Sequence, residues 1–143
     1  MYCIDASVLV NSFMEHEDHH EASKQLIEKI KKEGITVILP EIVLPEVSSA
    51  IARGTGDSHL ALEFVEHLKN ISDFVFTPIN REISDLSAKF AAYYKIRGYD
   101  SVYVAVSHIF GVKLITLDTE QIERSEDLIN SSTPEDELKM EEL

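Results

Sequence analysis

The sequence is poor in cysteine, in basic side chains and in long apolar stretches. Its single cysteine, Cys3, has no partner for an internal disulfide bond, so we expect it to fill a small apolar position in a strand. No apolar stretch approaches the roughly 20 residues that span a bilayer, which argues against membrane insertion. The first five residues lack the basic and apolar regions of a signal peptide, so we expect a cytoplasmic protein.

Basic side chains are scarce: 13 lysines and arginines face 26 acidic residues, for a formal net charge of −13. This balance is opposite to the basic footprint of a protein that coats nucleic acid. Part of the acidic excess lies in the last ten residues, PEDELKMEEL. We expect residues 135–143 to form a solvated acidic tail or a short terminal helix, and residues 1–134 to form a single domain.

The sequence also lacks the motifs of several enzyme classes. It contains no glycine-rich phosphate loop, no G-x-S-x-G turn and no pairing of a cysteine nucleophile with histidine. The residues after Asp5 lack the second aspartate of an aspartyl-phosphate phosphatase, which argues against a phosphatase or a phosphotransfer receiver. The HEDHH stretch at residues 16–20 has no cysteine or well-placed fourth ligand nearby, so we interpret it as a polar loop that enters a helix rather than a zinc site.

Apolar stretches alternate with helical patterns along the chain, which is typical of a parallel sheet covered by helices. We predict strands at residues 2–4, 36–39, 74–77 and 113–117, with a further short strand near 128–130. We predict helices at residues 19–32, 57–70, 80–97 and 100–110, and another with Pro45 in its first turn that ends at Gly54. The expected fold is an α/β/α sandwich with a parallel sheet of four to five strands.

Four acidic residues stand where this fold would bring them together. Asp5 and Asp118 directly follow predicted strands, and Glu46 and Asp100 lie in the first turns of predicted helices. Because ligands bind beyond the carboxyl ends of the strands in such sheets, we expect the four carboxylates to share one pocket. Like charges this close repel unless a divalent cation neutralises them, and oxygen ligands favour Mg²⁺ or Mn²⁺. The alternative is that the helix acids only stabilise helix N-termini and the strand-end acids are solvated.

A divalent cation in this pocket would hold a scissile phosphate and acidify a water molecule, so the expected reaction is phosphodiester hydrolysis that leaves a 5′-phosphate and a 3′-hydroxyl. Ser7 and Ser101 each stand close to one of the acids in the sequence. Their hydroxyl groups are candidates for hydrogen bonding to a carboxylate or to a metal-bound water.

Four stretches of the sequence together resemble the acidic motifs of PIN domains, especially those of VapC-type toxins and their archaeal relatives: IDASVLVNSF, LPEIVLPEVSSAI, GYDSVYVAVS and LITLDTE. The resemblance runs from Tyr2 to about Pro134. It implies a Mg²⁺- or Mn²⁺-dependent ribonuclease whose metal-site acids are Asp5, Glu46, Asp100 and Asp118, with Ser7 at the hydroxyl position after the first. It also implies frequent dimerisation and neutralisation by a small VapB-type antitoxin. Many relatives carry a further acid after the last motif, for which Glu120 and Glu123 are both candidates.

Few basic residues are placed to hold RNA on so acidic a protein. Arg53 lies about two helical turns after Glu46, and Lys95 and Arg97 come just before the Asp100 motif. We predict that these three contact phosphate groups, the alternative being that they are surface residues without a role in binding. Tyr99 and Tyr103 are candidates for stacking on a base, although for Tyr103 we favour packing in the core or in a dimer interface.

We therefore expect a metal-dependent endoribonuclease, the toxin of a type II toxin–antitoxin pair. The alternative is a catalytically inactive PIN-like domain that binds protein or RNA, which the heavy negative charge favours. Stabilisation by Mn²⁺ or Mg²⁺ and RNA cleavage that a chelator stops would distinguish the two.

Overall fold

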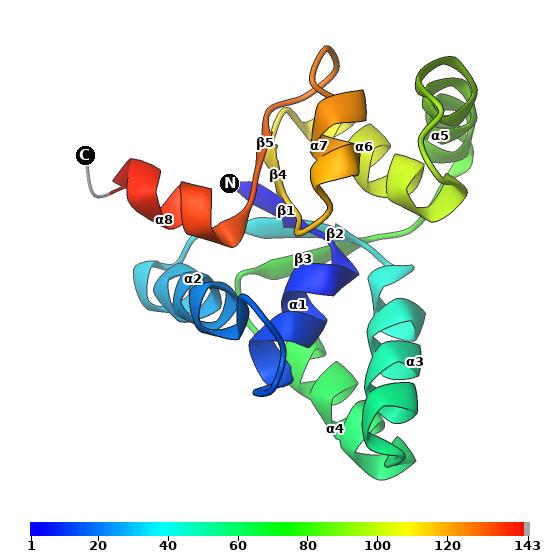
Figure 1. The fold of residues 1–143 in the computed structure, drawn as a ribbon. Helices are drawn as coiled ribbons and strands as arrows, with labels where there is room; N and C mark the ends of the chain where they lie inside the picture. The colour runs from blue at the N-terminus through cyan, green and yellow to red at the C-terminus, as the bar shows by residue number, and fades with distance from the viewer. Residues whose placement is uncertain (142–143) are drawn as a thin grey trace.

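The computed structural model describes residues 1–141, the side chain of Glu141 excepted, and is built around a five-stranded sheet (Figure 1). The strands are β1 (Tyr2–Ile4), β2 (Val37–Pro40), β3 (Phe74–Thr77), β4 (Lys113–Ile115) and β5 (Ser131–Ser132). Their order across the sheet is β3-β2-β1-β4-β5, and every pair is parallel. The chain therefore builds outward from β1 in one direction and then returns to build in the other, so the strand order reverses between β1 and β4. Ligands bind at such a reversal, beyond the carboxyl ends of the strands.

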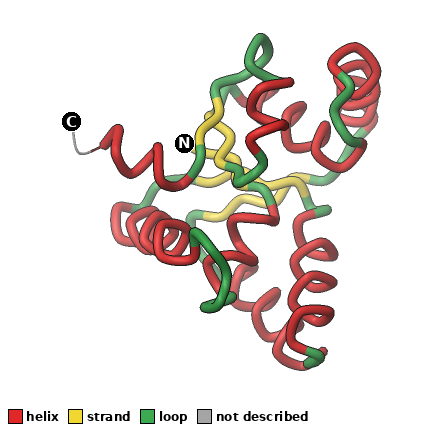
Figure 2. Tube along the Cα trace, viewed as in Figure 1, coloured by secondary structure: helices red, strands yellow, loops and turns green. Residues whose placement is uncertain are grey.

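Helices cover both faces of this sheet (Figures 1 and 2). They are α1 (Ala6–Phe13), α2 (His20–Glu33), α3 (Val43–Thr55), α4 (Ser58–Lys69), α5 (Arg81–Tyr94), α6 (Gly98–Phe110), α7 (Thr119–Arg124) and α8 (Pro134–Glu141). Helix α6 packs on β1, β2 and β4, and α5 packs against α6. On the other side α1 lies between α2 and α3, and α3 and α4 form a helical pair that extends away from the sheet.

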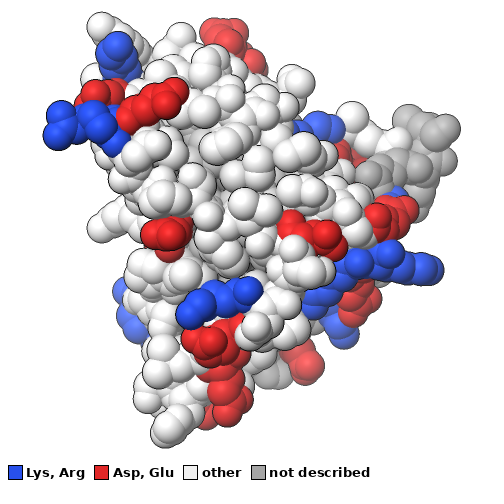
Figure 3. Space-filling model, turned by 180° about the vertical axis from the view of Figure 1, so that it is seen from behind, with Lys and Arg blue, Asp and Glu red and all other residues white. Residues whose placement is uncertain are grey.

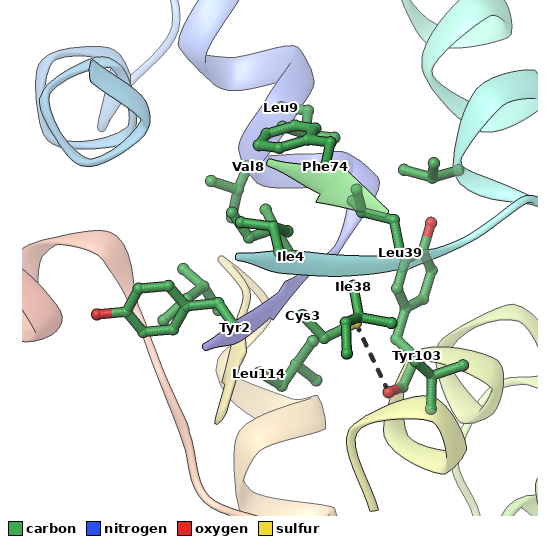
Figure 4. Close-up of a cluster of buried hydrophobic side chains, with 14 of the residues drawn as sticks. Tyr2, Cys3, Ile4, Val8, Leu9, Ile38, Leu39, Phe74, Tyr103 and Leu114 are labelled. Carbon is green, nitrogen blue, oxygen red and sulfur yellow. Dashed lines mark hydrogen bonds between the residues drawn. The ribbon is translucent and has the colours of Figure 1, made fainter. Parts of the chain in front are cut away.

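The core lies where β1 and β2 meet the helices on either side, and these strands are buried along their whole length. Figure 4 shows Ile4, Val8 and Leu9 together with Phe74, and Cys3 against helix α6. The Cys3 thiol lies 4.0 Å from the carbonyl oxygen of Tyr103. Because helices cover both faces, the strands have continuous apolar sequences rather than alternating ones.

The predicted α/β/α sandwich is confirmed, and the strands predicted at 2–4 and 74–77 have the observed bounds. The short last strand lies at Ser131–Ser132 rather than near 128–130. The single helix predicted over 80–97 is wrong at its end, because α5 stops at Tyr94 and Lys95 adopts a left-handed conformation with φ 55°. Gly98, the residue directly after that predicted helix, is the first residue of α6.

Two short helices were not predicted, and each begins at one of the acidic residues. Asp5 is the N-cap of α1 and Asp118 is the N-cap of α7, and in each case the side chain accepts a backbone hydrogen bond from the first turn. The apolar sequence of α1 resembles a continuation of the strand before it, and α7 has only six residues. Each strand therefore turns directly into a helix at an aspartate.

The acidic C-terminal segment contributes a helix to the fold through residue 141. Helix α8 packs against α2, and the Glu137 side chain is buried and forms an ion pair of 2.8 Å with Lys113 of β4. Glu137 is therefore not part of a solvated tail. Seen from behind, the upper and central part of the face is largely uncharged, and acidic and basic side chains lie along its sides and over its lower part (Figure 3).

Among residues 1–141, no helix combines the length and the apolar character that crossing a bilayer requires.

Candidate functional site

The four predicted acids converge on the carboxyl edge of the sheet. Asp5 follows β1 and Asp118 lies three residues beyond β4, the two strands between which the order reverses. Glu46 lies in the first turn of α3, and Asp100 lies in the first turn of α6. Their charges interact, because Asp5 and Asp118 both raise the pKa of Asp100, and Asp100 raises that of Glu46. Asp100 therefore links the four carboxylates into one electrostatic cluster.

Asp5 lies deepest of the four, with only 5% of its surface exposed. Its Oδ1 atom accepts hydrogen bonds from the backbone amide of Ser7, at 2.9 Å, and from the Ser7 hydroxyl, while Oδ2 accepts from the hydroxyl of Thr116. Burial raises the pKa of Asp5, and these hydrogen bonds oppose the rise. Asp5 is therefore not a solvated strand-end acid, and the role predicted for Ser7 as its hydrogen-bonding partner matches this contact.

Asp100 is the acid most affected by its neighbours. Burial, followed by the charges of Asp5 and Asp118, raises its pKa from 3.8 to about 6, and Arg97 acts in the opposite direction. A carboxyl group held this way takes up a proton as the pH falls to about 6, unless a cation compensates for the nearby negative charges. A concentration of perturbed carboxylates at one edge of a sheet is typical of a functional site.

Glu46 is held by a tyrosine that the sequence did not single out for this role. The buried Tyr103 hydroxyl donates a hydrogen bond of 2.5 Å to Oε1 of Glu46. Burial raises the pKa of Glu46, the hydrogen bond from Tyr103 lowers it, and the charge of Asp100 raises it. Tyr103 itself has a pKa raised by burial and by Glu46, so it remains the proton donor. Tyr103 therefore orients Glu46 instead of stacking on a base.

Two further polar residues, neither of them predicted, support the site: Thr116, directly after β4, and Gln121 of α7. Thr116 is fully buried; besides its bond to Asp5, its oxygen accepts from the backbone amide of Asp118 at 3.1 Å. Gln121 is 2% exposed, and its side chain contacts Thr116 and the backbone of Asp100. Ser101, by contrast, donates its hydroxyl to the carbonyl of Gly98, at 2.6 Å within its own helix. The sequence did contain a signal for Thr116: a threonine that directly follows a buried strand is itself buried, and its hydroxyl then needs a hydrogen-bonding partner.

A cleft of about 720 Å³ opens beside the acids between α1 and α3. Its lining includes Ser7 and Val10 from α1, Glu46 and Arg53 from α3, and Tyr99 from α6. A second, smaller depression of about 40 Å³ lies at Asp100 and Asp118, and Lys95, Arg97, Glu120 and Arg124 border it. The three basic residues predicted to contact phosphate groups therefore all border depressions next to the acids.

A comparison with protein families decides what kind of domain this is. The family model described as PIN domain matches residues 2–127, which includes all four acids. The chain belongs to the PIN domain family. The resemblance noted in the sequence is thereby confirmed. No curated protein matches the chain.

Solved structures share the fold of this PIN domain at low sequence identity. The toxin VapC20 of Mycobacterium tuberculosis, described as cleaving the sarcin–ricin loop, has a TM-score of 0.74 and 12% identity, over 86% of this chain and 94% of that chain. VapBC of Salmonella typhimurium bound to DNA has a TM-score of 0.71 and 14% identity, over 93% and 97%. A toxin–antitoxin complex from Klebsiella pneumoniae has a TM-score of 0.67 and 18% identity, over 94% and 98%.

The donor set of this PIN domain fits a hard divalent cation in its chemistry. The groups at the site are carboxylate oxygens, and burial together with the nearby charges of Asp5 and Asp118 raises the pKa of Asp100 to about 6. Within residues 1–141, no three His, Cys, Asp or Glu side chains are arranged so that they would hold an ion together. Mg²⁺ needs only one or two carboxylates, because water and phosphate oxygens complete its coordination.

Glu120, His19 and His20 each have a partner outside the four acids. Glu120 borders the smaller depression but forms an ion pair with Arg124, whereas Glu123 is exposed. In the HEDHH stretch, His20 contacts the carbonyl oxygen of Asn11 at 2.7 Å, and His19 contacts Glu135 at 2.5 Å. The stretch therefore leads into α2, in agreement with the predicted polar loop that enters a helix.

Proposed function

We propose that this PIN domain is a metal-dependent endoribonuclease that hydrolyses phosphodiester bonds, with Asp5, Glu46, Asp100 and Asp118 as the acids that hold Mg²⁺ or Mn²⁺. The observation that supports this most is the set of four interacting carboxylates at the strand-order reversal, where Asp100 has a pKa raised to about 6. Without a cation, this arrangement costs folding free energy, and a function explains why the chain retains it. A bound divalent cation would supply charge to hold a phosphate and to acidify a water molecule.

The residues around the acids have separate roles in this proposal. Ser7 and Thr116 hold Asp5 through their hydroxyl groups, and Tyr103 holds Glu46. Arg53, at the cleft between α1 and α3, binds a phosphate group on one side of the scissile bond. Lys95 and Arg97, at the smaller depression, bind phosphates on the other side. Tyr99, which is 65% exposed at the cleft, stacks on a base.

The experiment compares RNA cleavage by the purified chain and by Asp100→Asn, with Mn²⁺, with Mg²⁺ and with a chelator. We expect cleavage that requires the cation and that Asp100→Asn abolishes. The matched control is Asp85→Asn, which removes the same charge from an exposed position on α5 and is expected to cleave like the unmodified chain. Cleavage that continues in the chelator, or an active Asp100→Asn, would contradict the proposal.

The biological role that we propose is that of the toxin in a type II toxin–antitoxin pair, acting on cytoplasmic RNA as a homodimer and neutralised by a VapB-like antitoxin. Several structures that share the fold are toxin–antitoxin complexes, which supports this role. Expression of the chain alone is expected to stop growth of a bacterial host, and Asp100→Asn is expected to be harmless. Growth arrest by both forms would mean that toxicity does not depend on the acids.

An inactive binding module is the second candidate, and one observation favours it. Among the described residues, no three of the acidic side chains are placed so that they could bind one metal ion together. Such a module would show no change in melting temperature with Mn²⁺, whereas a protein that binds the ion only in its folded state is stabilised by it.

A further inference from the structure

Gln121 is a buried polar residue that contacts Asp100, Asp118 and the threonine that holds Asp5. It lies in the first turns of α7 with 2% of its surface exposed. Its Oε1 atom lies 3.1 Å from the hydroxyl oxygen of Thr116, and its Nε2 atom donates a hydrogen bond of 3.2 Å to the backbone carbonyl of Asp100. Its backbone amide donates to Oδ1 of Asp118 at 3.1 Å.

An amide is the side-chain group that satisfies both of these partners. The carbonyl oxygen of Asp100 can only accept, so it needs the N–H of the amide, and the hydroxyl of Thr116 can donate to the amide oxygen. That hydroxyl has one proton and two acceptors within reach, Oδ2 of Asp5 and Oε1 of Gln121. Gln121 therefore offers Thr116 an alternative partner when Asp5 turns its oxygen to a ligand.

We propose that Gln121 is a positioning residue, which fixes the start of α6 at Asp100 relative to Thr116 and Asp5 and so sets the affinity of the acids for a divalent cation. This inference rests on the proposed function, because it requires that the acids bind the cation. Gln121 touches neither the ion nor the substrate in this role and acts through Thr116 and the Asp100 backbone. Partners of this kind, one layer behind the ligands, are generally worth about 10–100-fold in metal affinity.

The test uses the full chain and measures the dissociation constant for Mn²⁺ by calorimetry, together with the melting temperature in chelator. Gln121→Met keeps the length of the side chain and removes both hydrogen-bonding groups. We expect it to raise the Mn²⁺ dissociation constant about 10–100-fold. The matched control is Ser125→Ala, which removes a buried hydroxyl from the end of the same helix, where it donates to the backbone carbonyl of Gln121 at 2.7 Å. The control is expected to bind Mn²⁺ like the unmodified chain.

A second variant decides the matter if Gln121→Met does not fold. Gln121→Asn keeps the amide but is one methylene shorter, so it cannot reach both Thr116 and the Asp100 carbonyl, and it is also expected to weaken Mn²⁺ binding. RNA cleavage by either variant should recover at high Mn²⁺ concentration, because the acids themselves remain. If the unmodified chain binds Mn²⁺ and the variants have dissociation constants within twofold of its value, the role of Gln121 is overturned and the proposed function is not. An unmodified chain that binds no Mn²⁺ would overturn this role and the proposed function together.

Discussion

Asp100→Asn is expected to stabilise the metal-free protein above pH 7, although it removes a residue of the candidate site. Burial and the charges of Asp5 and Asp118 raise the pKa of Asp100 from 3.8 to about 6 in the folded state. Between these two values the folded state keeps a proton that the unfolded state has lost, so stability falls as the pH rises through this interval. Above about pH 6 Asp100 is ionised in both states, and its ionised carboxylate then lowers the stability of the folded state by the full amount.

The magnitude follows from the same interval. Each pH unit corresponds to about 1.4 kcal/mol, which gives an upper limit of about 3 kcal/mol for Asp100. Because the side chain is partly exposed and solvent screens its charge, we expect a gain of about 1–2 kcal/mol for Asp100→Asn at pH 8. For a domain of this size that is a rise in melting temperature of roughly 3–8 °C. Near pH 4 the gain should shrink to about 0.5 kcal/mol or less, since Asp100 is then protonated in the folded state.

The assay is thermal unfolding in chelator at pH 4 and pH 8, with Asp85→Asn as the matched control. The control removes the same charge from a chain of net charge −13, so it measures the benefit of lower overall repulsion alone, expected to be within about 0.5 kcal/mol. Saturating Mn²⁺ should then reverse the order, because only the unmodified site gains from the ion. If Asp100→Asn is no more stable than the control at pH 8, the acids do not repel one another as the structure indicates.

Three other substitutions test the supports of the site and the core. Thr116→Val keeps the side-chain shape but removes the hydroxyl that Asp5 accepts from, and it should cost about 1–3 kcal/mol in urea unfolding and lower RNA cleavage; unchanged cleavage would contradict this role. Tyr103→Phe removes the donor to Glu46 and should lower cleavage about 10–100-fold with little change in fold, measured by initial rates and circular dichroism; equal rates would mean that Glu46 needs no support. Ile51→Ala empties a fully buried position on α3 and should cost about 2–5 kcal/mol in urea unfolding, while any Mn²⁺-dependent rise in melting temperature persists.

The parts of the fold that depend on local pattern could be predicted from the sequence. Buried parallel strands are continuous apolar stretches, so the strand Tyr2–Ile4 was recognisable, and so was helix α4 between its caps Asp57 and Asn70. The end of α5 could not be predicted, because Lys95 adopts a left-handed conformation that sequence rules assign to glycine. Helix α1 was missed because its apolar residues suit a strand as well as a buried helix.

The acids could be predicted because their positions follow from the topology, whereas their supports could not. A residue at the end of a parallel strand lies at a known edge of the sheet, so Asp5 and Asp118 could be placed together without coordinates. Gln121 and Tyr103 contact the site through side chains that leave helices at particular angles. Tyr103 reaches Glu46 across 57 residues of sequence, and no spacing rule relates the two. Their hydrogen bonds depend on how the helices pack.

A net charge of −13 and RNA as a substrate are compatible if the interaction is local. Of the 13 basic residues, Arg53, Lys95, Arg97 and Arg124 border the two depressions beside the acids. Arg124 is already engaged by Glu120, so few cationic groups are free to meet phosphates there. In the proposed mechanism the divalent cation must then supply much of the attraction for RNA, and it does so only at the point of cleavage. In the same mechanism the acidic surface elsewhere would repel RNA, so RNA would be held at the site and not along the rest of the molecule.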